Sequence, residues 1–339
     1  MQFMDKAEAE DILIQVSKDS RLQEGYHGVR LILREILRGE MVPIHDISRA
    51  VGIPVPAVSA TRRELEKRKL LSRKGGAILT DAGIKLLNSI GIFDTEIPDF
   101  NCQYEISDTV TKLVSQFDEL TKQRPSPDYS LDQSHATSLT CFKRVMYCHQ
   151  NDSIEGRDIA ILGDDDLTSV AMILFSTRFG LKINSLTVFD IDERILNFIE
   201  SMSLKLNFEI HLNKIDFIGE IPPRYKNSQD VFITDPPYTV EGLTRFISVG
   251  AEMLKERTNG LGFVSYSNLI PVENARLFKN IASMGLSPQE LIPAFNEYVG
   301  AQKHAGISKM GKFFSSGYLK TSDPTPRNLI YTNFKETSI

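Results

Sequence analysis

ILGDDDLTSVAM, residues 161–172, reads as a strand that turns into a helix through one glycine and three aspartates. Turns of this kind form nucleotide sites in parallel sheets, where neutral glycines and backbone N–H groups usually face an anionic ligand. Carboxylates at such a turn would repel an anion. The block of negative charge therefore indicates a ligand made of cationic and neutral groups.

Short apolar segments alternate with helical patterns on both sides of this turn, across residues 153–339. Such an alternation is typical of βαβ units around a parallel sheet. It predicts a doubly wound, Rossmann-like α/β sheet of the methyltransferase type. The predicted strands cover residues 157–163, 185–192, 208–217, 230–238 and 260–268, with edge strands at 290–299 and 327–334. Between those edge strands, residues 301–327 are predicted to form a long loop, either a lid or a disordered segment.

A compact helical unit precedes the sheet. Its helical patterns are followed by a short hairpin around Gly75 and Gly76 and by a helix that begins after Thr80. This order predicts an N-terminal winged-helix domain. The predicted domains are residues 1–95 for the winged helix, 96–152 for a connector or lid, and 153–339 for the Rossmann-like catalytic domain.

Basic residues gather on the second helix and the wing of this unit. They are Arg62, Arg63, Lys67, Arg68, Lys69, Arg73 and Lys74. One interpretation is a DNA-binding face, and the other is a solvated helix face in a docking or dimerisation module. The chain as a whole has a formal net charge of −5 and a pI near 5.8, which makes nucleic acid an unlikely partner.

The bulk composition bounds the remaining possibilities. The chain has 339 residues, 41% of them hydrophobic, which is enough for two packed domains. It contains no apolar run long enough for a membrane span, and its charged N-terminus lacks a signal-peptide core. The three cysteines form no CxxC pair, so we expect a cytoplasmic protein with no metal site and no membrane partner.

Acidic residues follow four of the predicted strands, at the edge of the sheet where ligands bind. Gly163 and the three aspartates Asp164, Asp165 and Asp166 follow the first strand. Asp190 closes the second strand and is expected to hold the two hydroxyls of a ribose. Asp192 is expected to cap the next helix. Asp216 and Phe217, after the third strand, are candidates for contacts with an adenine.

The fourth strand ends in DPPY, residues 235–238. This tetrapeptide resembles the [DNS]PP[YF] motif of amino-group methyltransferases, in which the acid accepts hydrogen bonds from the attacking amine and the ring stacks on a cation. Pro236 and Pro237 stiffen the turn. Asp235 and Tyr238 are therefore candidate catalytic residues that act on an amine.

A donor that suits this charge is decarboxylated S-adenosylmethionine, whose arm ends in an ammonium instead of the carboxylate of S-adenosylmethionine. The same crevice would attract a polyamine. The alternative is that one or two of the three aspartates only cap the helix that begins near Leu167.

Taken together, GDDDLTSVA, FDIDER and DPPYT behind a winged-helix segment resemble the archaeal and bacterial branched-chain polyamine synthases, the N4-bis(aminopropyl)spermidine synthases. The resemblance implies an aminopropyltransferase of polyamine biosynthesis. It would move two aminopropyl groups, one after the other, from decarboxylated S-adenosylmethionine to the N4 amine of spermidine and release 5′-methylthioadenosine. The donor would be a co-substrate, with no tightly bound cofactor.

Carried onto this chain, the resemblance implies a set of roles. Asp235 would orient N4 and accept its proton, Tyr238 would bound the amine site, and Asp164 would join them as a catalytic residue. The donor side would comprise Gly163, Asp165, Asp190, Asp216 and Phe217, and the acceptor side Asp166, Pro236, Pro237 and Gln133. We also expect a homodimer.

One departure and two alternatives stay open. The charged fraction of 24% lacks the enrichment expected of a hyperthermophile, which leaves the acceptor and the number of transfers undecided. The main alternative is an S-adenosylmethionine-dependent N-methyltransferase acting on nucleic acid. A transcription regulator with a degenerate catalytic domain is the other.

Overall fold

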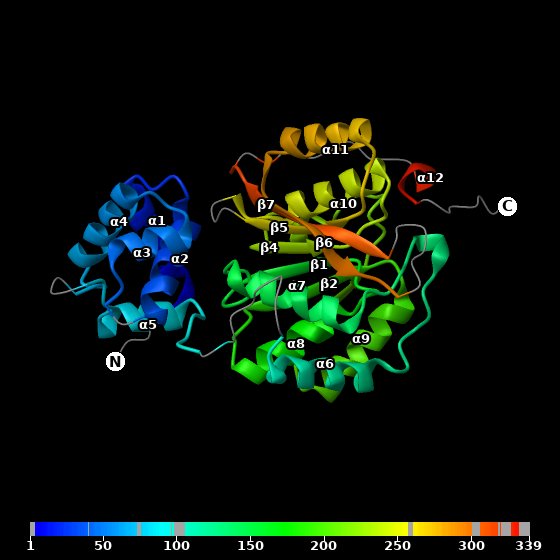
Figure 1. The fold of residues 1–339 in the computed structure, drawn as a ribbon, viewed down its shortest axis with the longest axis horizontal. Coiled ribbons are helices and arrows are strands. Elements are labelled where there is room, and N and C mark those ends of the chain that lie inside the picture. The colour runs from blue at the N-terminus through cyan, green and yellow to red at the C-terminus, as the bar shows by residue number, and fades with distance from the viewer. Residues whose placement is uncertain are drawn as a thin grey trace.

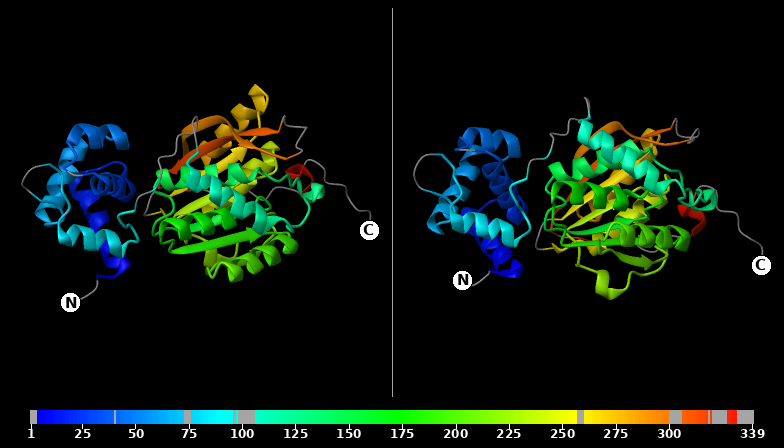
Figure 2. Two further views of the ribbon diagram at one scale, coloured as in Figure 1. Left: turned by 60° about the horizontal axis from the view of Figure 1, so that its bottom comes forward. Right: turned by 90° about the horizontal axis from the view of Figure 1, so that it is seen from below.

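The computed structural model describes residues 4–331, except 40, 73–75, 96, 98–105, 257–259, 300–305, 318 and 320–326. Helices α1–α5 form a small unit at one side of a larger α/β unit (Figure 1). The two further views show the same separation into a smaller and a larger part (Figure 2). Within the described residues, no helix is long and apolar enough to cross a membrane.

The larger unit is built on a seven-stranded sheet with the order β3-β2-β1-β4-β5-β7-β6. Strands β1 to β5 run parallel, whereas β7 is antiparallel to both β5 and β6. The strands are β1 Asp158–Leu162, β2 Ser185–Asp190, β3 His211–Lys214, β4 Val231–Thr234, β5 Leu261–Tyr266, β6 Leu286–Glu297 and β7 Ile307–Ser315. The predicted doubly wound α/β sheet is confirmed.

Helices cover both faces of this sheet (Figure 1). One face packs against α6 Asp108–Thr121, α7 Ser138–Gln150, α8 Thr168–Phe179 and α9 Glu193–Lys205, and the other against α10 Val240–Met253 and α11 Pro271–Ser283. Alternate residues of β1 enter the two cores: Ile159 and Ile161 enter one, and Ala160 and Leu162 the other. The first strand is thus buried on both faces, which explains why it reads as a continuous apolar run.

Two sequence predictions at the end of the chain are wrong. Residues 301–327 are not one long loop, because Ile307–Ser315 forms β7 between β5 and β6. Met310 and Phe313 of this strand are buried in the cores on opposite sides of the sheet, and that burial outweighs the glycines and lysines that suggested a loop. Over the described part of the edge strand predicted at 327–334, Arg327–Ile330 forms the short helix α12 instead.

In detail, Lys309, Lys312 and Phe314 are part of β7 together with Phe313. Lys303 lies outside the described residues, as do residues 332–339. The edge strand predicted at 290–299 is confirmed as β6. Its pairing with β7 is irregular, with register shifts between Pro288 and Glu290 and between Ile292 and Asn296.

The small unit has its own core, distinct from the two cores of the sheet. Its helices are α1 Lys6–Ser20, α2 Gly25–Arg38, α3 Ile44–Val51, α4 Val55–Lys67 and α5 Asp81–Ser89. Antiparallel bridges join Leu71 to Leu79 and Val42 to Ala77, where the wing is expected. The tip of that wing lies outside the described residues, so the winged-helix assignment stays a prediction.

A buried cluster of charges joins the small unit to the larger one. Arg30 of α2 donates to both carboxylate oxygens of Asp152, at 2.7 and 2.9 Å. Arg34 donates to Glu155 at 2.7 Å, and Arg157 donates to Asp152 at 2.6 Å. Asp152 is fully buried, and its three arginine neighbours hold the pKa of its carboxyl well below the usual range against the effect of burial. Buried ion pairs therefore connect the small unit to the larger one.

Removing the carboxylate from this cluster should destabilise the protein strongly. We expect Asp152→Asn to lower the free energy of unfolding by about 3–5 kcal/mol, because it leaves buried arginines without their counter-charge. A lowered pKa stabilises the fold above the pKa of the unfolded state, near 4, so the difference from wild type should shrink as the pH falls below that value. Urea unfolding at several pH values measures both effects.

Asp19→Asn is the matched control, because Asp19 pairs with Arg68 at an exposed position. It should change stability little. Equal losses for the two variants would contradict the role given to the buried cluster.

Candidate active site

The turn after β1 gives its three aspartates different surroundings. Gly163 adopts a left-handed backbone with φ of 73°, and Leu167 does so with φ of 61° at the start of α8. These two residues bend the chain sharply, so that consecutive side chains point in different directions. The position of each carboxylate is consequently fixed by the turn.

The Asp164 side chain is buried and caps the N-terminus of α8. Its carboxylate accepts the backbone N–H of Ser169 in the first turn of α8, with the nearer oxygen at 3.2 Å. The carboxyl is only 2% exposed, and burial raises its pKa to about 8. Leu167 gives α8 no side-chain cap, so Asp164 takes that place. This geometry fits the capping alternative for this residue.

Asp165 is partly exposed, whereas Asp164 and Asp166 are buried. One of its oxygens accepts the backbone N–H of Ser134 at 3.2 Å. Burial and the neighbouring carboxylates, Asp166 first, raise its pKa well above the usual value. A cationic ligand would relieve this repulsion.

Asp166 is neutralised inside the protein. It accepts a hydrogen bond from Arg144 at 2.6 Å and another from the backbone N–H of Ala136. Arg144 lies on α7, which packs beside α8 (Figure 1). Asp166 was predicted to bind the acceptor, but its carboxylate is already engaged in a buried ion pair with Arg144.

Asp190 links the turns after β1 and β2. One of its oxygens accepts the N–H of Asp164 at 2.8 Å, and the other accepts the N–H of Asp192 at 2.8 Å. Burial raises its pKa to about 6. The backbone N–H of Ile191 is a third donor to this carboxylate. Because its two oxygens can accept four hydrogen bonds in all, one position remains for a ribose hydroxyl.

The predicted capping role of Asp192 is confirmed: it begins α9 and accepts the N–H of Arg194 at 3.0 Å. Gln133, predicted to bind substrate, donates to Asp192 at 3.1 Å. After β3, Asp216 accepts the N–H of Ile218 at 3.1 Å. The neighbouring Phe217 is buried, with its ring 4.9 Å from that of Phe246.

The DPPY turn after β4 holds Asp235 in a network of donors. One oxygen accepts Tyr238 at 2.8 Å, and the other accepts Arg144 at 2.5 Å and Tyr298 at 2.6 Å. Burial raises the pKa of Asp235 to about 6, and Arg144 opposes that rise. The carboxylate is thus ionised at neutral pH and able to accept a proton. Pro236 and Pro237 are buried behind it.

Sequence reasoning missed Arg144 and Tyr298. Arg144 is 2% exposed in a helix whose other buried positions are mostly apolar, and an arginine on such a face was the available signal. Tyr298 follows β6, and it reaches Asp235 because β7 and β6 extend the sheet beyond β5. The position of Tyr298 in the site depends on tertiary packing, so no local sequence pattern identifies it.

The segment between α6 and α7, which is part of the predicted connector or lid, reaches these acids. It includes the short 3₁₀ turn Tyr129–Leu131, and residues 133–136 donate to Asp192, Asp165 and Asp166 through Gln133, Ser134 and Ala136. Its end pairs with the end of the β6 segment through a bridge between Ala136 and Tyr298. This segment therefore contacts three of the acids that follow β1 and β2.

Three of the seven basic residues named for the small unit pair with carboxylates, and Arg73 and Lys74 lie outside the described residues. Arg62 pairs with Glu66, Lys67 with Glu64, and Arg68 with both Glu64 and Asp19. These pairs reduce the positive charge that a DNA backbone would meet. Within the described residues, no group of His, Cys, Asp and Glu is placed to hold a metal ion.

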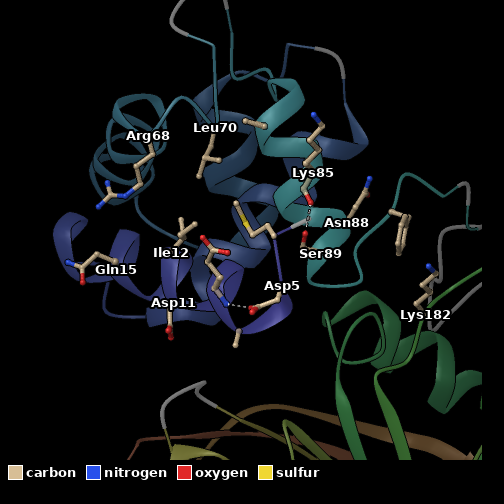
Figure 3. Close-up of a pocket in the computed structure, with 15 residues that line it drawn as sticks. Asp5, Asp11, Ile12, Gln15, Arg68, Leu70, Lys85, Asn88, Ser89 and Lys182 are labelled. Carbon is tan, nitrogen blue, oxygen red and sulfur yellow. Dashed lines mark hydrogen bonds between the residues drawn. The ribbon is translucent and has the colours of Figure 1, made fainter. Parts of the chain in front are cut away.

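A separate groove of about 1220 Å³ lies on the small unit, between α1 and α5 (Figure 3). It is lined by residues such as Ile12, Leu70 and Lys85, and Lys182 of the larger unit stands at its edge (Figure 3). None of the acidic strand-end residues lines it. The groove is therefore distinct from the candidate active site.

Comparison with known proteins gives consistent results. Residues 112–314 match the family model described as the branched-chain polyamine synthase A C-terminal domain. The chain is 33% identical to the N(4)-bis(aminopropyl)spermidine synthase of Thermococcus kodakarensis, over 77% of this chain and 74% of that protein. It is 34% identical to an uncharacterised protein of Methanocaldococcus jannaschii, over 86% of this chain and 74% of that protein.

The fold is similar to a solved structure, the branched-chain polyamine synthase of Thermus thermophilus in complex with N4-aminopropylspermidine and 5′-methylthioadenosine. The TM-score is 0.59 and the sequence identity 20%, with 95% of this chain and 97% of that chain covered. This likeness supports the architecture described above.

The raised pKa of Asp164 predicts an unusual effect of a substitution. A raised carboxyl pKa favours the fold below the unfolded-state pKa, near 4, and this contribution is lost as the pH rises towards about 8. Asp164→Asn keeps a cap for α8 but carries no charge, so it should raise the free energy of unfolding at about pH 8.5 by on the order of 2 kcal/mol. At about pH 4 it should change little. Thermal unfolding at both pH values measures this.

Asp166→Asn serves as the comparison, since Asp166 is paired with Arg144. It should destabilise the protein at both pH values because it leaves a buried arginine short of charge. The interpretation fails if Asp164→Asn destabilises the protein as much at high pH.

Proposed function

Because the chain belongs to the branched-chain polyamine synthase family, we propose that it transfers aminopropyl groups from decarboxylated S-adenosylmethionine to the N4 amine of spermidine. Two successive transfers would give first a tertiary amine and then a quaternary ammonium, with release of 5′-methylthioadenosine each time. The proposal is carried by one observation. Carboxylates with raised pKa values follow β1 and β2, with Asp164 and Asp190 buried and Asp165 partly exposed, and together they favour a cationic ligand.

Asp165 would bind an ammonium group. It is the partly exposed member of the three aspartates, and its raised pKa shows how poorly its charge is compensated without a ligand. An ammonium of the donor arm or of the polyamine would supply that compensation. The carboxylate of S-adenosylmethionine would be repelled at the same place, which favours the decarboxylated donor.

Asp190 would hold the ribose of the donor. Its oxygens are fixed by three backbone N–H groups, and one acceptor position remains for a ribose hydroxyl. Asp216 and Phe217 would lie at the adenine end, beyond β3, where Ile215 donates to the backbone oxygen of Asp190. Gly163 would let the chain approach the donor closely at the first turn.

Asp235 would act on the amine that attacks. In the first transfer, the N4 lone pair forms a bond to the carbon beside the sulfonium, the C–S electron pair goes to sulfur, and the N4 proton passes to Asp235. Its oxygen facing Tyr238 accepts one hydrogen bond and retains room for this proton. In the second transfer the tertiary amine has no proton to lose, so Asp235 and the ring of Tyr238 would face the permanent cation.

The alternative N-methyltransferase acting on nucleic acid is less well supported. A phosphate backbone would have to approach a crevice lined by carboxylates, and the basic residues of α4 are mostly paired. We propose that the small unit is a structural module and that nucleic acid is not its partner. The homodimer and the cytoplasmic location stay predictions.

Offering the enzyme spermidine with each donor in turn tests the proposed function. Mass spectrometry of the amine should show added aminopropyl units with decarboxylated S-adenosylmethionine only. Methyl addition from S-adenosylmethionine would instead support the N-methyltransferase. Omitting spermidine controls for hydrolysis of the donor.

Two substitutions should separate chemistry from donor binding. Asp235→Asn removes the proton acceptor and should lower kcat about 100-fold or more with little change in the KM of the donor. Asp190→Ala should mainly raise the KM of the donor, by about tenfold or more, through lost ribose hydrogen bonds. Steady-state kinetics with both substrates measures the split, and unchanged turnover of Asp235→Asn would refute its role.

Activity should rise with pH above neutrality. Asp235, with a pKa of about 6, accepts a proton only when ionised, and N4 attacks only when it is uncharged. Both requirements are met better as the pH increases. A profile of kcat that stays flat between about pH 6 and about pH 9 would contradict this assignment.

A further inference from the structure

Arg144 uses its whole guanidinium inside the protein. A guanidinium has five N–H donors, and each has a partner here. Nε donates to Asn296 at 2.8 Å, one terminal nitrogen to Asp166 at 2.6 Å and Thr168 at 3.4 Å, and the other to Asp235 at 2.5 Å and Tyr298 at 3.2 Å. The side chain therefore has no N–H left for a substrate.

These partners come from separate parts of the fold. Asp166 belongs to the turn after β1, Asp235 to the turn after β4, and Asn296 and Tyr298 to the end of β6. Asn296 is fully buried and continues the network to Ser308 of β7 at 2.9 Å. One side chain thus fixes the spacing between the acidic turn and the DPPY turn.

From this geometry we infer that Arg144 is a positioning residue for the proposed aminopropyl transfer: it sets the distance between the Asp166 turn and Asp235 while touching neither substrate. The inference rests on the proposed function and deepens it. A shift of the DPPY turn by a fraction of a bond length would move the proton acceptor away from N4, and such misplacement is costly for a reaction that depends on orientation.

Arg144 also balances the charge around Asp235. The groups that face Asp235 are Arg144 of α7, Asp165 and Asp166 of the β1 turn, its neighbour Tyr238, and Tyr298 after β6. Arg144 is the cation of this set, so it keeps Asp235 ionised among carboxylates. Without it, Asp235 would hold a proton at neutral pH and could not accept one from the amine.

Lysine cannot replace this arginine fully. Its ammonium has three donors and no planar fork, so it retains the charge but loses bridges between the turns. Two variants therefore separate the two effects: Arg144→Met removes charge and bridges, and Arg144→Lys removes bridges alone. Arg30→Lys is the matched control, since Arg30 is an equally buried arginine paired with Asp152 at the junction of the two units.

The experiment measures kcat against pH for the wild type and the three variants, with spermidine and decarboxylated S-adenosylmethionine. Arg144→Met should lower kcat about 100-fold or more and move the acidic limb of the profile upward by about 1–3 pH units. Arg144→Lys should lower kcat with the limb near its wild-type position and the KM of the donor nearly unchanged. Arg30→Lys should lower the unfolding temperature and leave both kinetic features in place.

Different results overturn different claims. Failure of the wild type to transfer aminopropyl groups would refute the proposed function. An active wild type with full kcat in Arg144→Lys, or with an unshifted limb in a folded Arg144→Met, would refute the role of Arg144. Should Arg144→Met not fold, the contrast between Arg144→Lys and Arg30→Lys decides, since equal losses of kcat in both would mean that Arg144 acts only on stability.

Discussion

The site depends on how buried carboxylates are compensated. Asp164, Asp166 and Asp190 are nearly excluded from water, and burying such charges costs several kcal/mol each unless donors or cations oppose it. Backbone N–H groups compensate Asp164 and Asp190 in part, and Arg144 compensates Asp166 and Asp235. The pKa values of Asp164 and Asp190 remain raised, to about 8 and about 6. The unmet part of this charge is what a cationic ligand would satisfy.

The helix α7 connects this charge balance to the small unit. It carries Arg144 near its middle, and at its end the backbone oxygen of His149 accepts Arg34 of α2 at 3.1 Å. Asp152 and Glu155 follow directly and pair with Arg30 and Arg34. One rigid element is thus held by arginine–carboxylate contacts at the active site and at the junction. This arrangement favours a structural role for the small unit over a DNA-binding one.

The sequence allowed us to predict the strands and the acids at their ends, because strands and helices alternate along the chain. It did not reveal the features that depend on contacts between distant segments. Strand ends carry their acids where a parallel sheet requires them, so Asp190, Asp192 and Asp235 could be placed from spacing alone. β7 was missed because its sequence includes Gly311, Lys309 and Lys312, whereas only the structure shows its pairing with two neighbours. Tyr298 joins the site through the same antiparallel addition to the sheet.

The three aspartates show the limit most clearly. Asp164, Asp165 and Asp166 are consecutive residues of the same type, yet the first caps α8, the second is partly exposed and the third pairs with Arg144. The difference arises from the left-handed residues Gly163 and Leu167, which rotate successive side chains away from each other. Leucine is not expected in that conformation, so no sequence pattern could assign the roles. Local backbone geometry therefore converts a uniform run of charge into a cap, a partly exposed carboxylate and an ion pair.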